Sequence, residues 1–242
     1  MSGYFALIPA RSGSKGISKK NLQVLDGYPL VAWAVAAAKE SQLFEHIVVS
    51  SDDSDILQVS QSYGASILIK RPANLAQDHS KQVPVILHAF ETLESMKIDV
   101  NHVVLLQPTC PFRSPELLKR AIDLHKAFLD RSLISVSDVS FLHDSHLYSG
   151  SLTDLDVTLK LRDNAGTLRQ DFSKRYWRNG SIYILNKADL MLGKLYAEKI
   201  VGIDIPFYET INIDECSDLR RAELMLNELY IREIRRLLFG NK

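Results

Sequence analysis

Cysteine is scarce in this sequence. Its 242 residues include two cysteines, Cys110 and Cys216, which lie far apart and form no C-x-x-C pair. This spacing predicts neither a disulfide framework nor a zinc site. A reducing compartment is therefore the expected environment.

Long apolar runs are also absent from the sequence. None approaches the ~20 residues that a helix needs to cross a bilayer. The first residues run into an apolar segment without the charged-then-apolar pattern of a secretory leader. We therefore expect a cytoplasmic protein.

The sequence has no excess charge of either sign. Its 29 basic and 29 acidic residues give a formal net charge of zero, which argues against a sequence-independent nucleic-acid binder or a membrane-surface binder. Any basic cluster is therefore a local feature. The length allows one large α/β core, alone or with an appendage, and we favour a core with an appendage.

A basic loop follows the first apolar run. Residues 4–8 are apolar and of strand length, and the segment after Pro9 is too rich in glycine and serine to continue a strand. The cations of this loop are Arg11, Lys15, Lys19 and Lys20. Backbone N–H groups and cationic side chains can both converge on one polyanion there, and a nucleoside triphosphate is the natural ligand.

The glycines of this loop fit neither of the two common phosphate loops. A Walker A loop has its lysine after the second glycine, whereas Lys15 precedes Gly16, and a dinucleotide fingerprint needs a third glycine besides Gly13 and Gly16. A flexible, solvated basic loop is the alternative interpretation. The position after the first strand of an α/β pattern favours a binding loop, because ligands of open parallel sheets lie beyond the carboxyl ends of strands.

Short apolar strands alternate with segments of helical length along most of the chain. The expected strands are 4–8, 46–51, 66–69, 101–106, 133–136 and 181–185, with shorter ones at 199–205 and 210–213. The expected helices are 29–38, 56–63, 83–96, 115–128 and 217–238. This alternation predicts an α/β fold, a Rossmann-like three-layer sandwich around a mostly parallel sheet.

Helical periodicity disappears between residues 138 and 174. Glycines there separate short apolar segments, which indicates β-hairpins. A hairpin extension is too small to hold its own core and usually packs on something else. We therefore divide the chain into a nucleotide-binding α/β core, residues 1–137 and 175–242, and an extension, residues 138–174.

Two further groups of residues could suggest a metal site. Asp52 and Asp53 follow the strand at 46–51, but carboxylates at a helix start complement the positive end of the helix dipole, and we favour helix capping. His143 and His146 share a spacing of three residues without a carboxylate partner. We assign no metal to them.

Five short motifs occur in order along nearly the whole chain. They are residues 8–16 with 20–22, residues 71–78, residues 105–113, residues 169–170 with 179–183, and residues 211–214. Together they resemble the motifs of the sugar-acid cytidylyltransferases, the acylneuraminate (CMP-sialic acid synthetase) family. Their shared order is more specific than any one motif. The resemblance also implies a homodimer in which the extension contacts a second subunit.

The resemblance implies that CTP activates a nine-carbon, sialic-type (nonulosonic) sugar acid, giving a CMP-sugar and pyrophosphate with the help of Mg²⁺ or Mn²⁺. The implied catalytic residues are Arg11, Lys20 and Asp214. The implied nucleotide-binding residues are Ala10, Arg11, Ser12, Gly13, Lys15, Gly16, Lys20, Asn21 and Arg71. The implied sugar-binding residues are Gln107, Arg169, Gln170 and Tyr183, and the implied metal ligands are Asp214 and Asn212.

The residue types suit this chemistry. Transfer of a nucleotidyl group needs cations, backbone donors and a carboxylate-bound metal, and it needs no covalent nucleophile. Arg11 offers phosphate oxygens a planar fork, and Lys20 offers them a point charge. Asp214 supplies a hard oxygen ligand for Mg²⁺. Cys110 has no expected role, because the reaction needs no thiolate.

Several roles stay open between two interpretations. Gln107 follows the most apolar strand in a proline-stiffened turn, where it either binds a substrate group or ties the loop together. Arg169 either binds the acceptor carboxylate or forms a surface salt bridge. We expect Asp78 to shape the loop after Pro72 and Arg113 to have a structural role.

The chain departs from the family pattern in three places. Asn212 replaces the first of two usual aspartates, the usual His-Pro and following lysine are missing from residues 141–147, and residues 177–180 read Trp-Arg-Asn-Gly where Arg-Pro-Asn-Gly is common. All three changes lie toward the sugar or the metal. CTP use is therefore predicted more firmly than an N-acetylneuraminate acceptor, and legionaminate and pseudaminate remain possible acceptors. The alternatives are a Kdo cytidylyltransferase and a catalytically weak nucleotide-binding paralogue.

Overall fold

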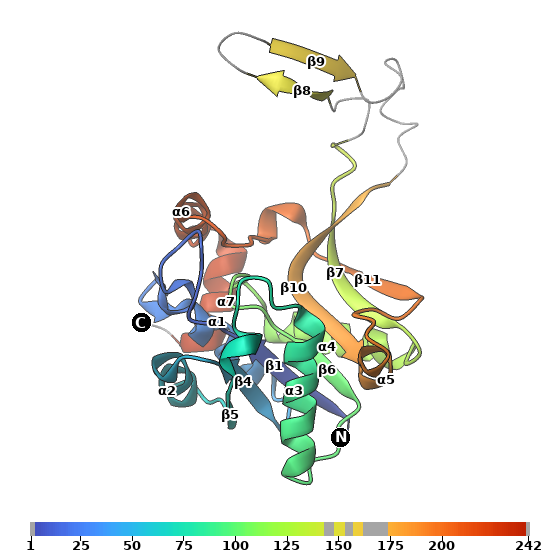
Figure 1. The fold of residues 1–242 in the computed structure, drawn as a ribbon. Coiled ribbons are helices and arrows are strands. Elements are labelled where there is room, and N and C mark those ends of the chain that lie inside the picture. Colours follow the sequence, from blue (N-terminus) through green and yellow to red (C-terminus); the bar gives the residue numbers. More distant parts are fainter. Residues whose placement is uncertain (1–2, 143–147, 153–156, 162–173, 241–242) are drawn as a thin grey trace.

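A seven-stranded sheet forms the centre of the molecule (Figure 1). The computed structural model describes residues 3–142, 148–152, 157–161 and 174–240. In spatial order the strands are β11 (Ile200–Asp204), β7 (Ser132–Asp138), β10 (Tyr176–Asn186), β6 (His102–Leu105), β1 (Tyr4–Pro9), β4 (Ile47–Ser51) and β5 (Ile67–Lys70). β10 is antiparallel to both of its neighbours, and the other adjacent pairs of this sheet are parallel. The predicted mostly parallel sheet is confirmed.

Helices cover both faces of this sheet. One face carries α1 (Leu30–Ser41), α2 (Ser54–Ser62), α4 (Pro115–Lys126), α6 (Cys216–Met225) and α7 (Leu229–Phe239), and the other carries α3 (Gln82–Ser95) and α5 (Lys187–Met191). Side chains alternate along β1, as they do along any strand. Ala6 and Ile8 pack in the cluster that contains Trp33 of α1, whereas Phe5 and Leu7 pack with Phe90 of α3. The three-layer sandwich predicted from the sequence is confirmed.

The C-terminal part of the core differs from the prediction in two ways. The helix expected at 217–238 is two helices, α6 and α7, because the backbone turns tightly at Asn227, whose N–H donates to the carbonyl oxygen of Leu224. Residues 210–213 are not a strand. They follow the 3-10 helix η5 (Phe207–Glu209), and the N–H of Ile213 donates to the carbonyl oxygen of Thr109, so this segment is tied to the loop after β6 and not to the sheet.

Five small elements were not predicted besides η5. They are the short helix α5, the 3-10 helices η1 (Lys20–Leu22) and η2 (Ala73–Leu75), and the strand pair β2 (Val24–Leu25) and β3 (Tyr28–Pro29). β10 also begins five residues earlier than the strand expected at 181–185. Among the described residues, none of the helices is long and apolar enough to cross a membrane.

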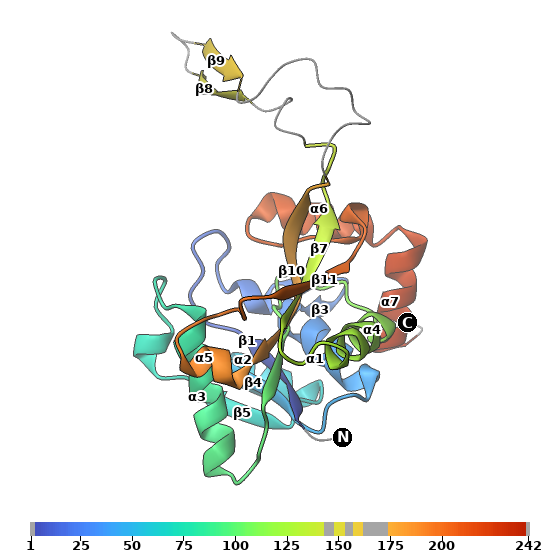
Figure 2. The same cartoon turned by 90° about the vertical axis from the view of Figure 1, so that its right-hand side faces the viewer.

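The predicted extension contains an antiparallel strand pair, β8 (Tyr148–Leu152) with β9 (Val157–Leu161). Both views draw this pair away from the sheet, beyond the ends of β7 and β10 (Figures 1 and 2). The chain leaves the sheet at Asp138 and returns to it at Tyr176. The role of the extension in a dimer stays a prediction.

Candidate active site

A cleft of about 320 Å³ opens at the carboxyl ends of the parallel strands. Four segments line it: the loop after β1, the loop between β5 and α3, the loop after β6, and the segment before α6. The predicted residues among its lining are Arg11, Gly13, Lys20, Asn21, Arg71, Gln107, Asn212 and Asp214. The structure therefore brings residues from both ends of the chain to one cavity.

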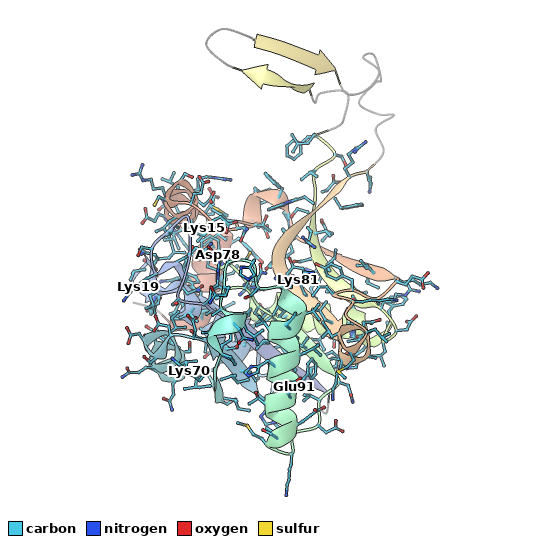
Figure 3. The ribbon with its side chains drawn as sticks, viewed as in Figure 1. Lys15, Lys19, Lys70, Asp78, Lys81 and Glu91 are labelled. Carbon is cyan, nitrogen blue, oxygen red and sulfur yellow. The ribbon has the colours of Figure 1, made fainter. Side chains whose placement is uncertain are left out.

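Asp78 holds two cations of the basic loop. Its carboxylate lies 2.6 Å from Nη1 of Arg11 and 3.5 Å from Nζ of Lys15, and Figure 3 shows Lys15 and Asp78 next to each other. The hydrogen bond from Arg11 lowers the pKa of Asp78, with a smaller contribution from Lys15. We had expected Asp78 only to shape its own loop. The structure shows that it also joins that loop to the basic loop.

Asp214 holds the third cation. Nζ of Lys20 lies 2.8 Å from one carboxylate oxygen of Asp214, and Nδ2 of Asn212 donates to the other at 2.6 Å. Arg11, Lys15 and Lys20 therefore face two carboxylates, which leaves this group with one net positive charge, and Arg71 in the cleft wall adds another. An entering polyanion can replace these carboxylates as the partner of the cations.

Gly16 allows the basic loop to touch the segment that carries Asp214. A Cβ atom placed on Gly16 would lie 2.1 Å from the carbonyl oxygen of Asp214, a distance that no real side chain can adopt. The two segments can therefore meet only if the residue at position 16 has no side chain. Gly13 faces open space, since a Cβ atom there would meet nothing within 4 Å.

Asp52 anchors the start of the basic loop. Its carboxylate accepts hydrogen bonds from the N–H of Ser12 at 2.8 Å and from the hydroxyl of Ser12 at 2.5 Å. Burial works to raise the pKa of Asp52, but the two hydrogen bonds outweigh it and the pKa is lowered. The neighbouring Asp53 caps α2 by accepting from the N–H groups of Asp55 and Ile56. Helix capping is therefore confirmed for Asp53 and was the wrong interpretation of Asp52.

Asn21 and Arg71 form part of the cleft wall and are both nearly buried. Nδ2 of Asn21 donates to the carbonyl oxygen of Arg11 at 2.8 Å, which fixes the backbone that carries the arginine. Nη2 of Arg71 donates to the carbonyl oxygen of Ser50 at 2.6 Å. Burial lowers the pKa of Arg71 to about 10. Their expected contacts with cytidine stay a prediction.

Gln107 lines the cleft in the loop after β6, beside Gly180. A Cβ atom on Gly180 would lie 3.3 Å from Oε1 of Gln107 and 3.8 Å from the hydroxyl of Tyr183. Tyr183 is nearly buried behind them, and burial raises its pKa to about 12. Gln107 and Tyr183, the two described sugar-binding candidates, are therefore neighbours. Arg169 and Gln170 lie outside the described residues, as do His143 and His146.

Arg113 supports this part of the cleft from within the core. Its side chain is fully buried, and it donates to the carbonyl oxygens of Ser181, at 2.7 Å, and of Gln107. Burial lowers the pKa of Arg113 to about 10. These bonds tie the loop after β6 to β10, which is the structural role that we expected.

The metal-ligand candidates provide one carboxylate and one amide. Over the described ranges, no group of three or more histidine, cysteine, aspartate or glutamate side chains is arranged to hold a metal ion. Oδ1 of Asn212 lies 3.7 Å from Sγ of Cys110, which donates to it, so the amide nitrogen faces Asp214. Mg²⁺ takes few protein carboxylates and completes its shell with waters and phosphate oxygens. Asp214, at the edge of a cationic cleft, fits such a site.

From the loop between β5 and α3, the sequence indicated Arg71 as a nucleotide-binding residue, but it did not indicate the rest of this wall. Besides Asp78, the residues not indicated are Leu75, Gln77 and Ser80 of the loop and Gln82, Val85 and Ile86 of α3. One signal could have revealed it. The loop follows the carboxyl end of a parallel strand, which is the position that identified the basic loop.

Replacing Gly16 with alanine should separate the basic loop from Asp214. The added methyl group collides with a backbone carbonyl, so we expect the affinity for a nucleoside triphosphate to fall at least about tenfold, measured by calorimetric titration. Ser18→Ala is the control, because Ser18 is exposed in the same loop and does not line the cleft. Equal affinities in the two variants would contradict the role assigned to Gly16.

Comparison with known proteins agrees with this geometry. A family model described as cytidylyltransferase matches residues 5–214. A CMP-N,N'-diacetyllegionaminic acid synthase of Legionella pneumophila is 34% identical over 91% of this chain and 95% of that protein. A pseudaminic acid cytidylyltransferase of Campylobacter jejuni is 28% identical over 90% of this chain and 94% of that protein.

Solved structures share the fold at lower identity. A CMP:2-keto-3-deoxy-manno-octonic acid synthetase in complex with CTP superimposes with a TM-score of 0.66 at 16% identity, covering 94% of this chain and 100% of that one. This likeness concerns the fold alone. The family match spans most of the chain, including the basic loop and Asp214, and the chain therefore belongs to the cytidylyltransferase family.

Proposed function

We propose that the chain transfers a cytidylyl group from CTP to a sialic-type, nine-carbon sugar acid, giving a CMP-sugar and pyrophosphate. One observation carries the proposal: Gln107 lines one cleft together with Arg11, Lys20 and Asp214, and Lys15 lines an adjoining hollow with the same three residues. The cations suit the triphosphate, and the polar amide suits a hydroxylated acceptor.

The cations act by binding and neutralising charge. In the proposed reaction the anomeric hydroxyl oxygen of the acceptor attacks the α-phosphorus of CTP, while the bond to pyrophosphate breaks. Arg11 and Lys20 bind the phosphate oxygens, on which negative charge grows as pyrophosphate leaves. Asn21 holds the backbone of Arg11, and Asp52 holds Ser12, so the loop is ordered before the substrate arrives.

Asp214 would hold Mg²⁺ or Mn²⁺ together with phosphate oxygens of the nucleotide. When bound, this ion would neutralise charge on the α-phosphate and on the leaving pyrophosphate. Lys20, now paired with Asp214, would turn to the phosphates and free the carboxylate. Asn212 contributes no charge, and in its present orientation it orients Asp214 by donating a hydrogen bond.

The relatives support a nine-carbon acceptor. Proteins named for diacetyllegionaminic acid and pseudaminic acid align with at least 90% of this chain. An N-acylneuraminate cytidylyltransferase of Escherichia coli is 35% identical over 75% of it, which is 42% of that longer protein. The eight-carbon Kdo is less favoured, because the octonic acid synthetase supports the fold only.

We also propose a homodimer and a cytoplasmic location. The antiparallel pair β8 and β9 lies away from the sheet, where a second copy can reach it (Figure 1). Both cysteines are free thiols, one buried and one exposed, as expected in a reducing compartment.

Pyrophosphate release from CTP over a panel of sugar acids tests the proposed function. We expect turnover with at least one of N-acetylneuraminate, legionaminate and pseudaminate, and Lys20→Gln should lower kcat at least about a hundredfold. Lys119→Gln is the control, since this lysine lies on the surface of α4. Tight CTP binding without turnover of any acid would contradict the proposal and favour a nucleotide-binding paralogue.

Restoring the second carboxylate tests the metal assignment. Asn212→Asp places another hard anionic oxygen beside Asp214, so the Mg²⁺ concentration for half-maximal turnover should fall several-fold. Asp214→Asn, with the carboxylate removed, should raise it or abolish turnover. An unchanged Mg²⁺ requirement in both variants would place the metal elsewhere.

A further inference from the structure

β10 contains an irregularity next to Gln107. Arg178 pairs with Val136 of β7, and Tyr183 pairs with Ile134, so five steps along β10 face two steps along β7. Residues 179–182, four residues that face the single residue Ser135 of β7, leave the regular ladder between these two strands. Such bulges re-aim the side chains that flank them and are frequent beside active sites.

Buried hydrogen bonds fix this irregularity. The side chain of Asn179 accepts from the hydroxyl of Ser135 at 2.6 Å and donates to the hydroxyl of Ser137 at 2.9 Å. The N–H of Ile182 donates to the same Ser135 hydroxyl at 2.8 Å. Gly180 adopts φ +83°, which a side chain rarely tolerates, and faces Oε1 of Gln107. The backbone is therefore held beside Gln107, which lines the cleft.

Arg178 precedes this fixed segment and points to a pair of tyrosines. Nη1 of Arg178 donates to the hydroxyl of Tyr196 at 2.5 Å, and its guanidinium carbon lies 5.7 Å from the centre of that ring. The Tyr196 ring stacks on Tyr183 with centroids 6.4 Å apart. Two opposing effects act on the pKa of Tyr183. Burial raises this pKa, and the positive charge of the nearby Arg178 lowers it by a smaller amount.

Among the described residues, no carboxylate forms an ion pair with Arg178, in contrast to Arg11, Lys15 and Lys20. Tyr196 takes Nη1 and leaves the edge formed by Nε and Nη2 for a second acceptor. That edge matches the two oxygens of a carboxylate.

We propose that Arg178, oriented by Tyr196, binds the carboxylate of the acceptor and selects acidic sugars over neutral ones. The inference rests on the proposed function and adds Arg178 to the sugar-side residues named from the sequence. Distance permits it, because two residues of chain span about 7 Å at most and separate Arg178 from Gly180, which abuts Gln107. Arg178 does not line the cleft itself, and its long side chain would extend from this position to an acceptor that lies against Gln107.

Steady-state kinetics with an acid and its methyl ester test the inference. A charge-assisted pair is worth about 1.5–3 kcal/mol, so Arg178→Gln should raise the KM for the acid about tenfold to a hundredfold. The methyl ester lacks the negative charge, so we expect the wild type to use it poorly. Its KM should be almost the same in Arg178→Gln as in the wild type. The KM for CTP should stay within about twofold, which also shows that the variant folds.

Two further variants separate binding from support. Arg178→Lys keeps the charge without the planar fork and should lie between the wild type and Arg178→Gln. Tyr196→Phe keeps the ring and removes the hydroxyl that orients the guanidinium, so it should raise the KM for the acid several-fold. Arg232→Gln, on the exposed side of α7, is the matched control and should have no effect.

The outcomes distinguish this inference from the function on which it rests. Normal wild-type turnover with an unchanged acid KM in Arg178→Gln would overturn the inference alone. Equal losses for acid and ester would also overturn it, because they would indicate a role that does not involve the carboxylate. A wild type that used no sugar acid would overturn the proposed function and the inference together.

Discussion

The close contact between Gly16 and the Asp214 carbonyl determines where the site can form. It joins a loop from the start of the chain to a segment almost two hundred residues later, and a single methyl group would prevent it. Around this contact the sheet fixes the remaining walls, because the carboxyl ends of β1, β4 and β6 lie side by side. The chemistry of the cleft depends on bringing these separate segments together.

Once these segments meet, electrostatics explains why the cleft favours an anionic ligand. Asp78 and Asp214 balance most of the charge of Arg11, Lys15 and Lys20, so the cationic side chains stay ordered without a nucleotide. Exposed ion pairs of this kind contribute little stability. A triphosphate can therefore displace the carboxylates at small cost, and the displacement of Lys20 would leave Asp214 available for the proposed metal ion.

Local patterns predicted the fold well, and they predicted the position of the basic loop, because apolar strands and glycine-rich ends are properties of neighbouring residues. They failed where the structure depends on contacts between residues that lie far apart in the sequence. The pairing of Arg11 with Asp78 joins residues 67 positions apart, and the bonds of Asn179 to Ser135 and Ser137 shape an irregularity that no local pattern encodes. Residues 210–213 are apolar enough for a strand, but Ile213 is tied to Thr109 instead of to the sheet.

In the proposed function, the basic loop and Asp214 hold the triphosphate tail of CTP. Calorimetric titration of the wild-type protein with CTP, CDP, CMP and cytidine checks this binding mode. We expect affinity to fall with each phosphate removed, at least about tenfold from CTP to CMP, and CTP binding to weaken as salt is added, since charge dominates the contacts. Equal affinity for CMP and CTP, with no dependence on salt, would contradict it.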